Sequence, residues 1–213
     1  MNQIEALQRL RNLGTPVIES RDVAALLRVS ASNATTILRR LAAAEMLIHL
    51  SRGRWLINPS IDRLALPELI SAPSPAYVSM QSALFHHGLI EQIPSILYAV
   101  TLGRPRRVTT PIVTISFHHI PPELFTGFEL SDSSDAKIAT PEKALFDLVY
   151  LAPGRSRIFS SLPELTIPRR FQWSLLKQYT ALVNSSSRRA FIAERIRAIR
   201  SFSGNPAGKN SKE

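Results

Sequence analysis

The first third of the chain alternates helical and strand-like patterns of apolar positions. Apolar residues at intervals of three or four predict helices over residues 2–13, 20–27 and 31–44. Gly14 is expected to end the first helix, and Ser20 and Ser30 are expected to cap the second and third. A turn of three residues, 28–30, separates the last two helices. The third helix is expected to bury Ala34, Ile37, Leu38 and Leu41.

Two strand-like runs follow, over residues 47–50 and 54–57, on either side of Ser51-Arg52-Gly53. Glycine suits the positive φ of a tight hairpin turn. Trp55 and Ile57 are two residues apart, so both are expected to face the core. The order helix, turn, helix and hairpin predicts a winged helix-turn-helix over residues 1–60, with the 31–44 helix in a DNA major groove.

The rest of the sequence predicts a second, mixed unit. Residues 61–75 are expected to form a connector with a short helix near 64–70. Further helices are predicted over 79–88, 140–151, 173–183 and 188–202, and strands over 96–102, 111–118, 128–130 and 137–139. Thr140 and Pro141 suit the N-cap and first position of a helix. We therefore predict an α+β fold: a winged helix-turn-helix, then a mixed α/β C-terminal domain over 76–202 that ends in helices, and a disordered tail over 203–213.

Positive charge gathers at the two ends of the chain. Residues 1–60 hold 8 basic and 4 acidic residues, and residues 154–213 hold 12 basic and 3 acidic ones. Residues 61–153 hold 6 basic and 9 acidic residues, so the chain has a net charge of +10. Basic ends around a mildly acidic middle predict a polyanionic partner for the ends, with double-stranded DNA foremost.

Several classes of protein are disfavoured by what the sequence lacks. There is no cysteine, which excludes disulfides and thiolate metal sites. The first residues do not resemble a secretory signal, and no apolar run approaches the roughly 18 residues that span a bilayer. We expect a cytoplasmic protein with no membrane partner.

The predicted recognition helix leaves a polar face opposite its buried one. That face consists of Ser32, Asn33, Thr35, Thr36, Arg39 and Arg40. Asparagine can bond adenine bidentately, and a threonine methyl can touch a thymine methyl. Arg39 and Arg40 lie further along the helix and are expected at phosphates. The alternatives are a three-helix scaffold that does not contact DNA and a winged helix that binds protein.

Other arginines are candidates for contacts with DNA or a partner. Arg52 and Arg54 flank Gly53 in the predicted wing, where guanidinium groups suit a narrow minor groove or its phosphates. The alternative is a solvated turn. Further candidates for DNA-backbone or partner contacts are Arg104, Arg106, Arg107, Arg188, Arg189, Arg195 and Arg197. A solvated loop tip and ordinary helix packing are the alternatives for these.

An enzyme is the less favoured interpretation. The pairs His86-His87 and His118-His119 each point to opposite sides of their element, which is poor geometry for a shared metal. Asp132, Asp135, Lys137 and Glu142 faintly resemble a nuclease cluster, but turn chemistry in a Ser/Asp-rich loop accounts for the aspartates. No phosphate-binding loop or nucleophile motif is present. We expect no catalysis, no metal and no cofactor.

The arrangement as a whole resembles the AbiEi-type antitoxins of toxin–antitoxin and phage-defence loci. The resemblance is carried by the N-terminal module, the segments 77–90 and 96–101, and most specifically Ile138-Ala-Thr-Pro-Glu-Lys-Ala-Leu-Phe-Asp-Leu-Val149. It implies a repressor that binds inverted repeats in its own promoter and a C-terminal domain that counters a nucleotidyltransferase-like toxin, by direct or indirect contact. The alternative is a ligand-responsive or protein-interaction regulator unconnected to a toxin.

Overall fold

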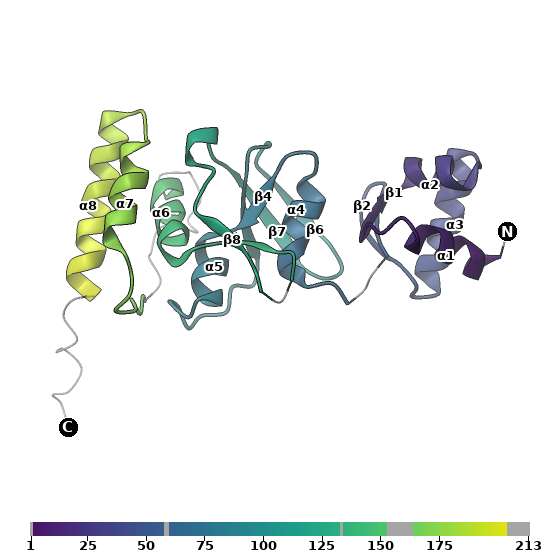
Figure 1. Ribbon diagram of the computed structural model, residues 1–213, viewed down its shortest axis with the longest axis horizontal. Coiled ribbons are helices and arrows are strands. Elements are labelled where there is room, and N and C mark those ends of the chain that lie inside the picture. The colour runs from purple at the N-terminus through teal and green to yellow at the C-terminus, as the bar shows by residue number, and fades with distance from the viewer. Residues whose placement is uncertain (1, 58–59, 133, 153–163, 204–213) are drawn as a thin grey trace, which may run out of the picture.

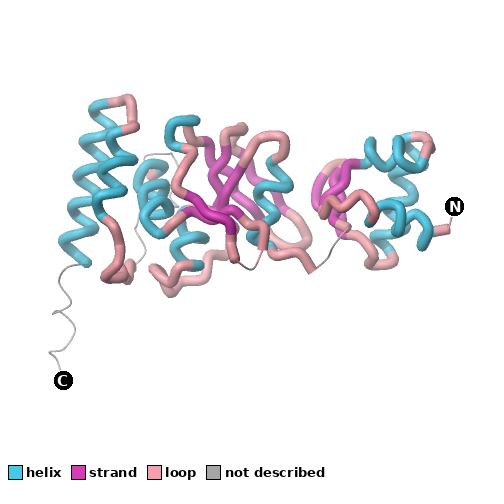
Figure 2. The backbone as a smooth tube through the Cα atoms, viewed as in Figure 1, coloured by secondary structure: helices cyan, strands magenta, loops and turns pink. Residues whose placement is uncertain are grey.

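The computed structural model describes residues 2–57, 60–132, 134–152 and 164–203, so the predicted tail falls outside the described residues from residue 204 on. The fold is α+β, as predicted. Figure 1 shows an elongated molecule with a helical N-terminal part at one end, a sheet with its helices in the middle and a helical pair at the other end. Strands occur in the first two parts, whereas the last part is helical (Figure 2).

The N-terminal part contains three helices and a small antiparallel sheet. The helices are α1 (Gln3–Arg11), α2 (Ser20–Leu27) and α3 (Ala31–Ala43), and the strands are β1 (Val17–Glu19), β2 (Ile48–Ser51) and β3 (Arg54–Leu56) in the order β1-β3-β2. The three predicted helices and the hairpin strands are confirmed. The strand β1 was not predicted, because only three residues pair there, from Val17 opposite Leu56 to Glu19 opposite Arg54.

The predicted helix caps in this part are correct at α3 and wrong at α1 and α2. Ser30 caps α3, accepting a hydrogen bond from the backbone N–H of Asn33 at 3.3 Å. Ser20 is the first residue of α2, and its Oγ accepts a bond from Trp55 Nε1 at 2.9 Å. Helix α1 already ends at Arg11, so Gly14 supplies its positive φ in the following turn. The Trp55 side chain is buried in the core, as predicted.

The middle part is built on a mixed sheet in the order β6-β7-β5-β4-β9-β8. Its strands are β4 (Ala76–Val78), β5 (Leu97–Thr101), β6 (Arg106–Thr109), β7 (Thr114–His119), β8 (Phe128–Leu130) and β9 (Lys137–Ala139). The pairs β5/β7 and β4/β9 are parallel and the others antiparallel. Strand β6 was missed because an exposed edge strand lacks alternating apolar residues, and β4 was missed because it is short and buried at every position.

Helices surround this sheet and continue to the C-terminal end. Three of these helices are short: η1 (Arg63–Ala65), α4 (Leu66–Ser71) and η2 (Pro122–Leu124). The longer ones are α5 (Met80–His86), α6 (Pro141–Leu151), α7 (Trp173–Ala181) and α8 (Ser186–Ser203). Thr140 caps α6 as predicted, accepting from the backbone N–H of Lys143 at 3.3 Å. Helix α6 packs against α5, α7 and α8, and every residue from Glu142 to Tyr150 is buried.

The N-terminal hairpin packs against the middle part. Leu50 and Leu56 belong to the large hydrophobic cluster of the sheet and its helices, whereas Trp55 and Ile57 belong to the smaller cluster of α1, α2 and α3. The hairpin therefore contributes one face to each core. The division at residues 60 and 75 stays a prediction. Of the helices that the structure describes, none combines the length and apolarity needed to cross a membrane.

Candidate nucleic-acid interface

Helix α3 is held in place by its turn from α2 and by one apolar side. Arg28 adopts a left-handed backbone conformation, with φ of 53°, and the N–H of Val29 donates to the carbonyl of Ala24 at 3.1 Å. These features end α2, and the next helix then begins after Ser30. Leu38 and Leu41 are fully buried beneath α3. The opposite side of α3 is consequently turned outward.

The structure brings the six predicted recognition residues together on this outward side. We call the surface formed by Ser32, Asn33, Thr35, Thr36, Arg39 and Arg40 the α3 face; all are exposed except Thr35, which is half-buried. The Thr36 hydroxyl donates to the carbonyl of Ser32 at 3.0 Å, which leaves its methyl group for apolar contact. Within the described part of the chain, the side chains of Asn33, Arg39 and Arg40 have no hydrogen-bond partner. Their donors are thus available to an external acceptor.

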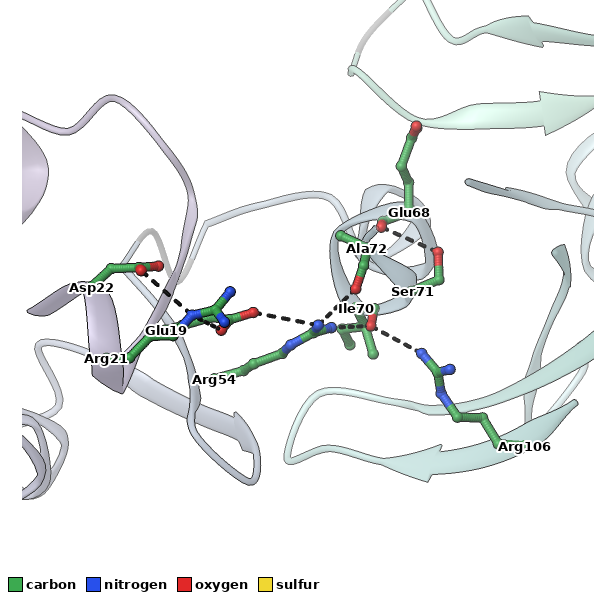
Figure 3. A network of polar contacts seen from close by, with 9 residues as sticks. All are labelled: Glu19, Arg21, Asp22, Arg54, Glu68, Ile70, Ser71, Ala72 and Arg106. Carbon is green, nitrogen blue, oxygen red and sulfur yellow. Dashed lines mark hydrogen bonds and ion pairs between the residues drawn. The ribbon is translucent and has the colours of Figure 1, made fainter. Parts of the chain in front are cut away.

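The two arginines of the hairpin differ in their surroundings. Arg52 is exposed at the tip, next to Gly53, which has a φ of 75°. The side chain of Arg54 is only 21% exposed, and it turns back toward α4 (Figure 3). Its Nη1 donates to the carbonyl of Ile70 and its Nη2 to that of Ala72 at 2.7 Å. The expectation of a pair of arginines facing DNA is therefore corrected, because Arg54 is engaged within the chain.

The anchoring of Arg54 follows from the chemistry of a helix end. The last carbonyls of a helix have no partner within it and carry partial negative charge, so they attract cations. Arg106 reaches the same carbonyl of Ile70 with Nη2 at 3.1 Å, and its guanidinium lies 5.0 Å from the Phe117 ring centroid. Glu19 completes the network at 3.5 Å from Arg54 (Figure 3). Arg106, expected in a loop tip, is instead an anchored residue of an edge strand.

The basic residues of α8 are not brought beside α3. The C-terminal helices lie at the opposite end of the molecule, with the sheet between them and the N-terminal part (Figure 1). Arg188 donates to the carbonyl of Tyr150 at 2.8 Å and stacks 4.3 Å from its ring centroid. Arg189 donates to the carbonyls of Val183 and Asn184. These two arginines stabilise the helix packing, so the expectation that α8 continues the N-terminal DNA surface is corrected.

The remaining candidates are more accessible. Arg104, Arg107 and Arg197 are exposed, and Arg195 is half-buried with its guanidinium 5.8 Å from the Phe191 ring centroid. Arg107 lies on the edge strand β6 and Arg104 in the loop before it, whereas Arg197 lies on α8. Strand β6 contacts β2 of the hairpin, but α8 lies at the opposite end of the molecule from α3, so Arg197 does not share a surface with the α3 face (Figure 1).

A buried polar cluster in the middle part was missed by the sequence analysis. Lys143 and Asp147, one turn apart on α6, are both fully buried and form an ion pair. Asp147 also accepts hydrogen bonds from Tyr77 Oη at 3.0 Å and Ser79 Oγ at 2.7 Å. Burial and the Asp147 carboxylate raise the pKa of Tyr77, and burial lowers the pKa of Lys143. The cluster ties β4 to α6.

The residues weighed for catalysis do not converge. Lys137 pairs with Glu68, and Glu142 accepts a hydrogen bond from the backbone of Gln172 at 2.8 Å. The ring of His87 donates from Nε2 to the carbonyl of Ala139 at 2.8 Å, and burial lowers its pKa. Among the residues described, no three His, Asp or Glu side chains gather where they would hold a metal ion.

Comparisons with known proteins give a limited result. No protein-family model matches the chain, and no curated protein matches it. Among solved structures, the crystal structure of the RV2827C protein from Mycobacterium tuberculosis is similar at a TM-score of 0.46 and 15% sequence identity. The match covers 88% of this chain and 79% of that one. A likeness at this level transfers no function.

Proposed function

We propose that the N-terminal part is a winged helix-turn-helix and that its α3 face binds the major groove of double-stranded DNA. The observation that carries the proposal is the α3 face itself. It combines an asparagine, two threonines and two arginines on the outward side of a helix whose other side packs into the smaller hydrophobic cluster, with Ile37 half-buried at its margin. A helix with exposed donors and an apolar back is the element that DNA-binding modules of this class insert into the groove.

The residues of this surface have separate roles in the proposal. Asn33 and Thr36, near the start of α3, contact base edges and carry the sequence preference. Arg39 and Arg40 bind phosphates and supply affinity that depends on salt. Arg52 reaches a neighbouring groove or its phosphates from the hairpin tip. Arg54 contributes indirectly, because its bonds to Ile70 and Ala72 hold the hairpin against the middle part.

We extend the proposal to an AbiEi-type antitoxin that represses its own operon and counters a nucleotidyltransferase-like toxin. This part rests on the resemblance of residues 138–149. The polar residues of that segment lie in the core around Asp147, so the segment accounts for a shared scaffold rather than a shared contact surface. Co-expression with the adjacent gene product tests the extension: rescue of growth supports it, and continued toxicity contradicts it.

The DNA-binding half is tested by titrating the full chain against a duplex from its own promoter and against a scrambled duplex, with fluorescence anisotropy as the readout. We expect Asn33→Ala to reduce the preference for the promoter by ~1–3 kcal/mol, the range for one bidentate base contact. Asn184→Ala is a matched control, because Asn184 is also exposed and belongs to the turn between α7 and α8, and these helices lie at the other end of the molecule (Figure 1). Equal promoter affinity for both variants contradicts the assignment of Asn33 to a base. A protein that binds neither duplex favours the protein-interaction or ligand-responsive alternative.

A further inference from the structure

The two C-terminal helices enclose a groove that the DNA-binding proposal does not use. From α7 the groove is lined by Trp173, Lys177 and Thr180, and from α8 by Ala193, Ile196, Arg197 and Arg200. Residues three, four and seven positions apart share one side of a helix, so each set forms a single stripe. The two stripes face one another across a cavity of about 400 Å³. This volume lies within the range of small-molecule sites.

The floor of the groove is apolar. Ile196 is 9% exposed and Trp173 is half-buried, and both pack against the large hydrophobic cluster. The hydroxyl of Thr180 donates to the carbonyl of Leu176 at 2.6 Å, so its proton is already used. The floor therefore offers contact area for an apolar group, and the Thr180 hydroxyl proton is not available to it.

The rim of the groove is cationic. Lys177, Arg197 and Arg200 are exposed at its edge, and none of the described residues that line it is a carboxylate. The Arg200 guanidinium lies 5.8 Å from the centroid of the Trp173 ring. Glu194 is the single acidic residue in the sequences of α7 and α8, and it is not among the lining residues. Within the described residues, neither Lys177 nor Arg197 has an ion-pair partner, whereas Lys137 and Arg54 each have a glutamate. An anion bound here would relieve the mutual repulsion of the three cations.

We propose that this groove binds an amphipathic anion, a small molecule with an apolar body and a carboxylate, sulfonate or phosphate head. The body packs on Trp173 and Ile196, and the head bonds Lys177 and Arg197 at the rim. Guanidinium and ammonium groups form short charge-assisted bonds to such heads. The site is independent of the α3 face, which lies at the other end of the molecule. It adds a ligand site that the proposed DNA binding does not require.

Decanoate is a suitable probe, with 1-decanol as its uncharged match. Trp55→Phe leaves Trp173 as the single tryptophan, so its fluorescence reports on the groove directly. We expect saturable quenching or a spectral shift with decanoate and a much weaker response with decanol. We expect calorimetry on the unaltered chain to give the same dissociation constant. This agreement would show that Trp55→Phe leaves the groove unchanged.

The charge requirement is tested by the double variant Lys177→Ala/Arg197→Ala. Each lost charge-assisted bond weakens binding, so we expect the affinity for decanoate to fall by about tenfold or more. Arg195→Ala is the matched control, because Arg195 lies on the same helix outside the groove, beside Phe191. We expect its affinity to equal that of the unaltered chain.

Three results overturn the proposal. One is the absence of saturable binding of decanoate up to about 1 mM, an affinity corresponding to about −4 kcal/mol. Another is equal binding of decanol and decanoate, which removes the role of the cations. The third is displacement of decanoate by a short DNA duplex, combined with weaker binding of that duplex by the variant Lys177→Ala/Arg197→Ala. The groove would then be a nucleic-acid surface.

Discussion

The helices α3 and α6 begin in the same way and lie in opposite surroundings. Ser30 and Thr140 each accept a hydrogen bond from the backbone three residues on, both at 3.3 Å. From that start, α3 keeps Asn33, Arg39 and Arg40 exposed, whereas α6 buries its charged residues completely or nearly so. Similar local chemistry thus produces a surface in one place and a core in the other.

The comparison shows that the segment on which the resemblance rests and the exposed polar side chains lie in different helices. The expected resemblance to AbiEi-type antitoxins rests mainly on residues 138–149, yet Lys143 and Asp147 of that segment face inward and join β4 to α6. The polar side chains of α3, in contrast, lie at the surface. The residues behind the resemblance therefore belong to the scaffold, while the proposed contact surface consists of common polar residues on an exposed helix.

The largest expected effect comes from removing one partner of the buried pair in α6. Asp147→Ala leaves Lys143 charged without a carboxylate and removes the acceptor of Tyr77 and Ser79. We expect a loss of ~3–5 kcal/mol in the free energy of unfolding, measured by urea titration. Lys143→Met/Asp147→Leu is expected to lose less, because no unpaired charge remains. The exposed Asp132→Ala serves as control, and an equal loss there would contradict the structural role of Asp147.

A second effect separates the two arginines of the hairpin. Arg54→Ala removes two hydrogen bonds from a charged group to the end of α4, and we expect it to lower the free energy of unfolding by ~1.5–3 kcal/mol. Arg52→Ala is expected to change stability by less than ~0.5 kcal/mol. In DNA titrations we expect Arg52→Ala to have the clearer direct effect. It should lower the slope of log affinity against log salt by the amount that corresponds to about one phosphate contact. An unchanged free energy of unfolding for Arg54→Ala would contradict a stabilising role of these hydrogen bonds.

The two N-caps allow a finer comparison of α3 with α6. Ser30→Ala is expected to destabilise the fold by ~1 kcal/mol, the usual cost of losing a cap. Thr140→Ala should cost more, since the cap of α6 is part-buried whereas that of α3 is exposed, so water replaces the lost acceptor less easily. Thermal and urea unfolding of the two variants measure the difference. A greater loss for Ser30→Ala would show that the capped end of α6 is held by packing alone.

The smallest effect concerns pH. Burial lowers the pKa of His87 below the ordinary value of 6.5, although its bond to the Ala139 carbonyl opposes the shift. Burial, followed by the nearby Arg107, lowers the pKa of His118 as well. The unfolded chain then binds more protons than the folded one, so stability is full above pH 6.5 and declines as the pH falls below it. His87→Gln should flatten this decline in urea titrations at a series of pH values; an unchanged slope contradicts the contribution of His87.

The sequence was sufficient for elements with a regular period and an obvious start. Helices α3 and α6, their caps and the hairpin strands agree with expectation, because apolar spacing and N-cap residues are local signals. The α3 face was predictable for the same reason, as the complement of a buried stripe. Strand β4 was missed because its partners β5 and β9 are distant in the sequence, and β6 was missed because an exposed edge strand has no alternating apolar residues.

The placement of individual charged residues was the part that local patterns did not predict. Arg54 bonds carbonyls 16 and 18 residues away, and Asp147 bonds hydroxyls 68 and 70 residues away. A charged residue in a first turn or at a hairpin tip is expected at the surface by default. Only the tertiary fold brings the end of α4 to the hairpin and β4 to α6, and these contacts decide that Arg54 and Lys143 face inward.

The most direct test of the account is the salt dependence of DNA binding by Arg39→Ala/Arg40→Ala, with Arg169→Ala/Arg170→Ala as control. Both variants lose two adjacent exposed arginines, but only the first pair lies on the α3 face. For the first, we expect the slope of log affinity against log salt to fall by about 2, close to 0.9 for each phosphate contact. The control should keep the slope of the unaltered chain. Identical slopes for the two variants would contradict the claim that α3 binds DNA.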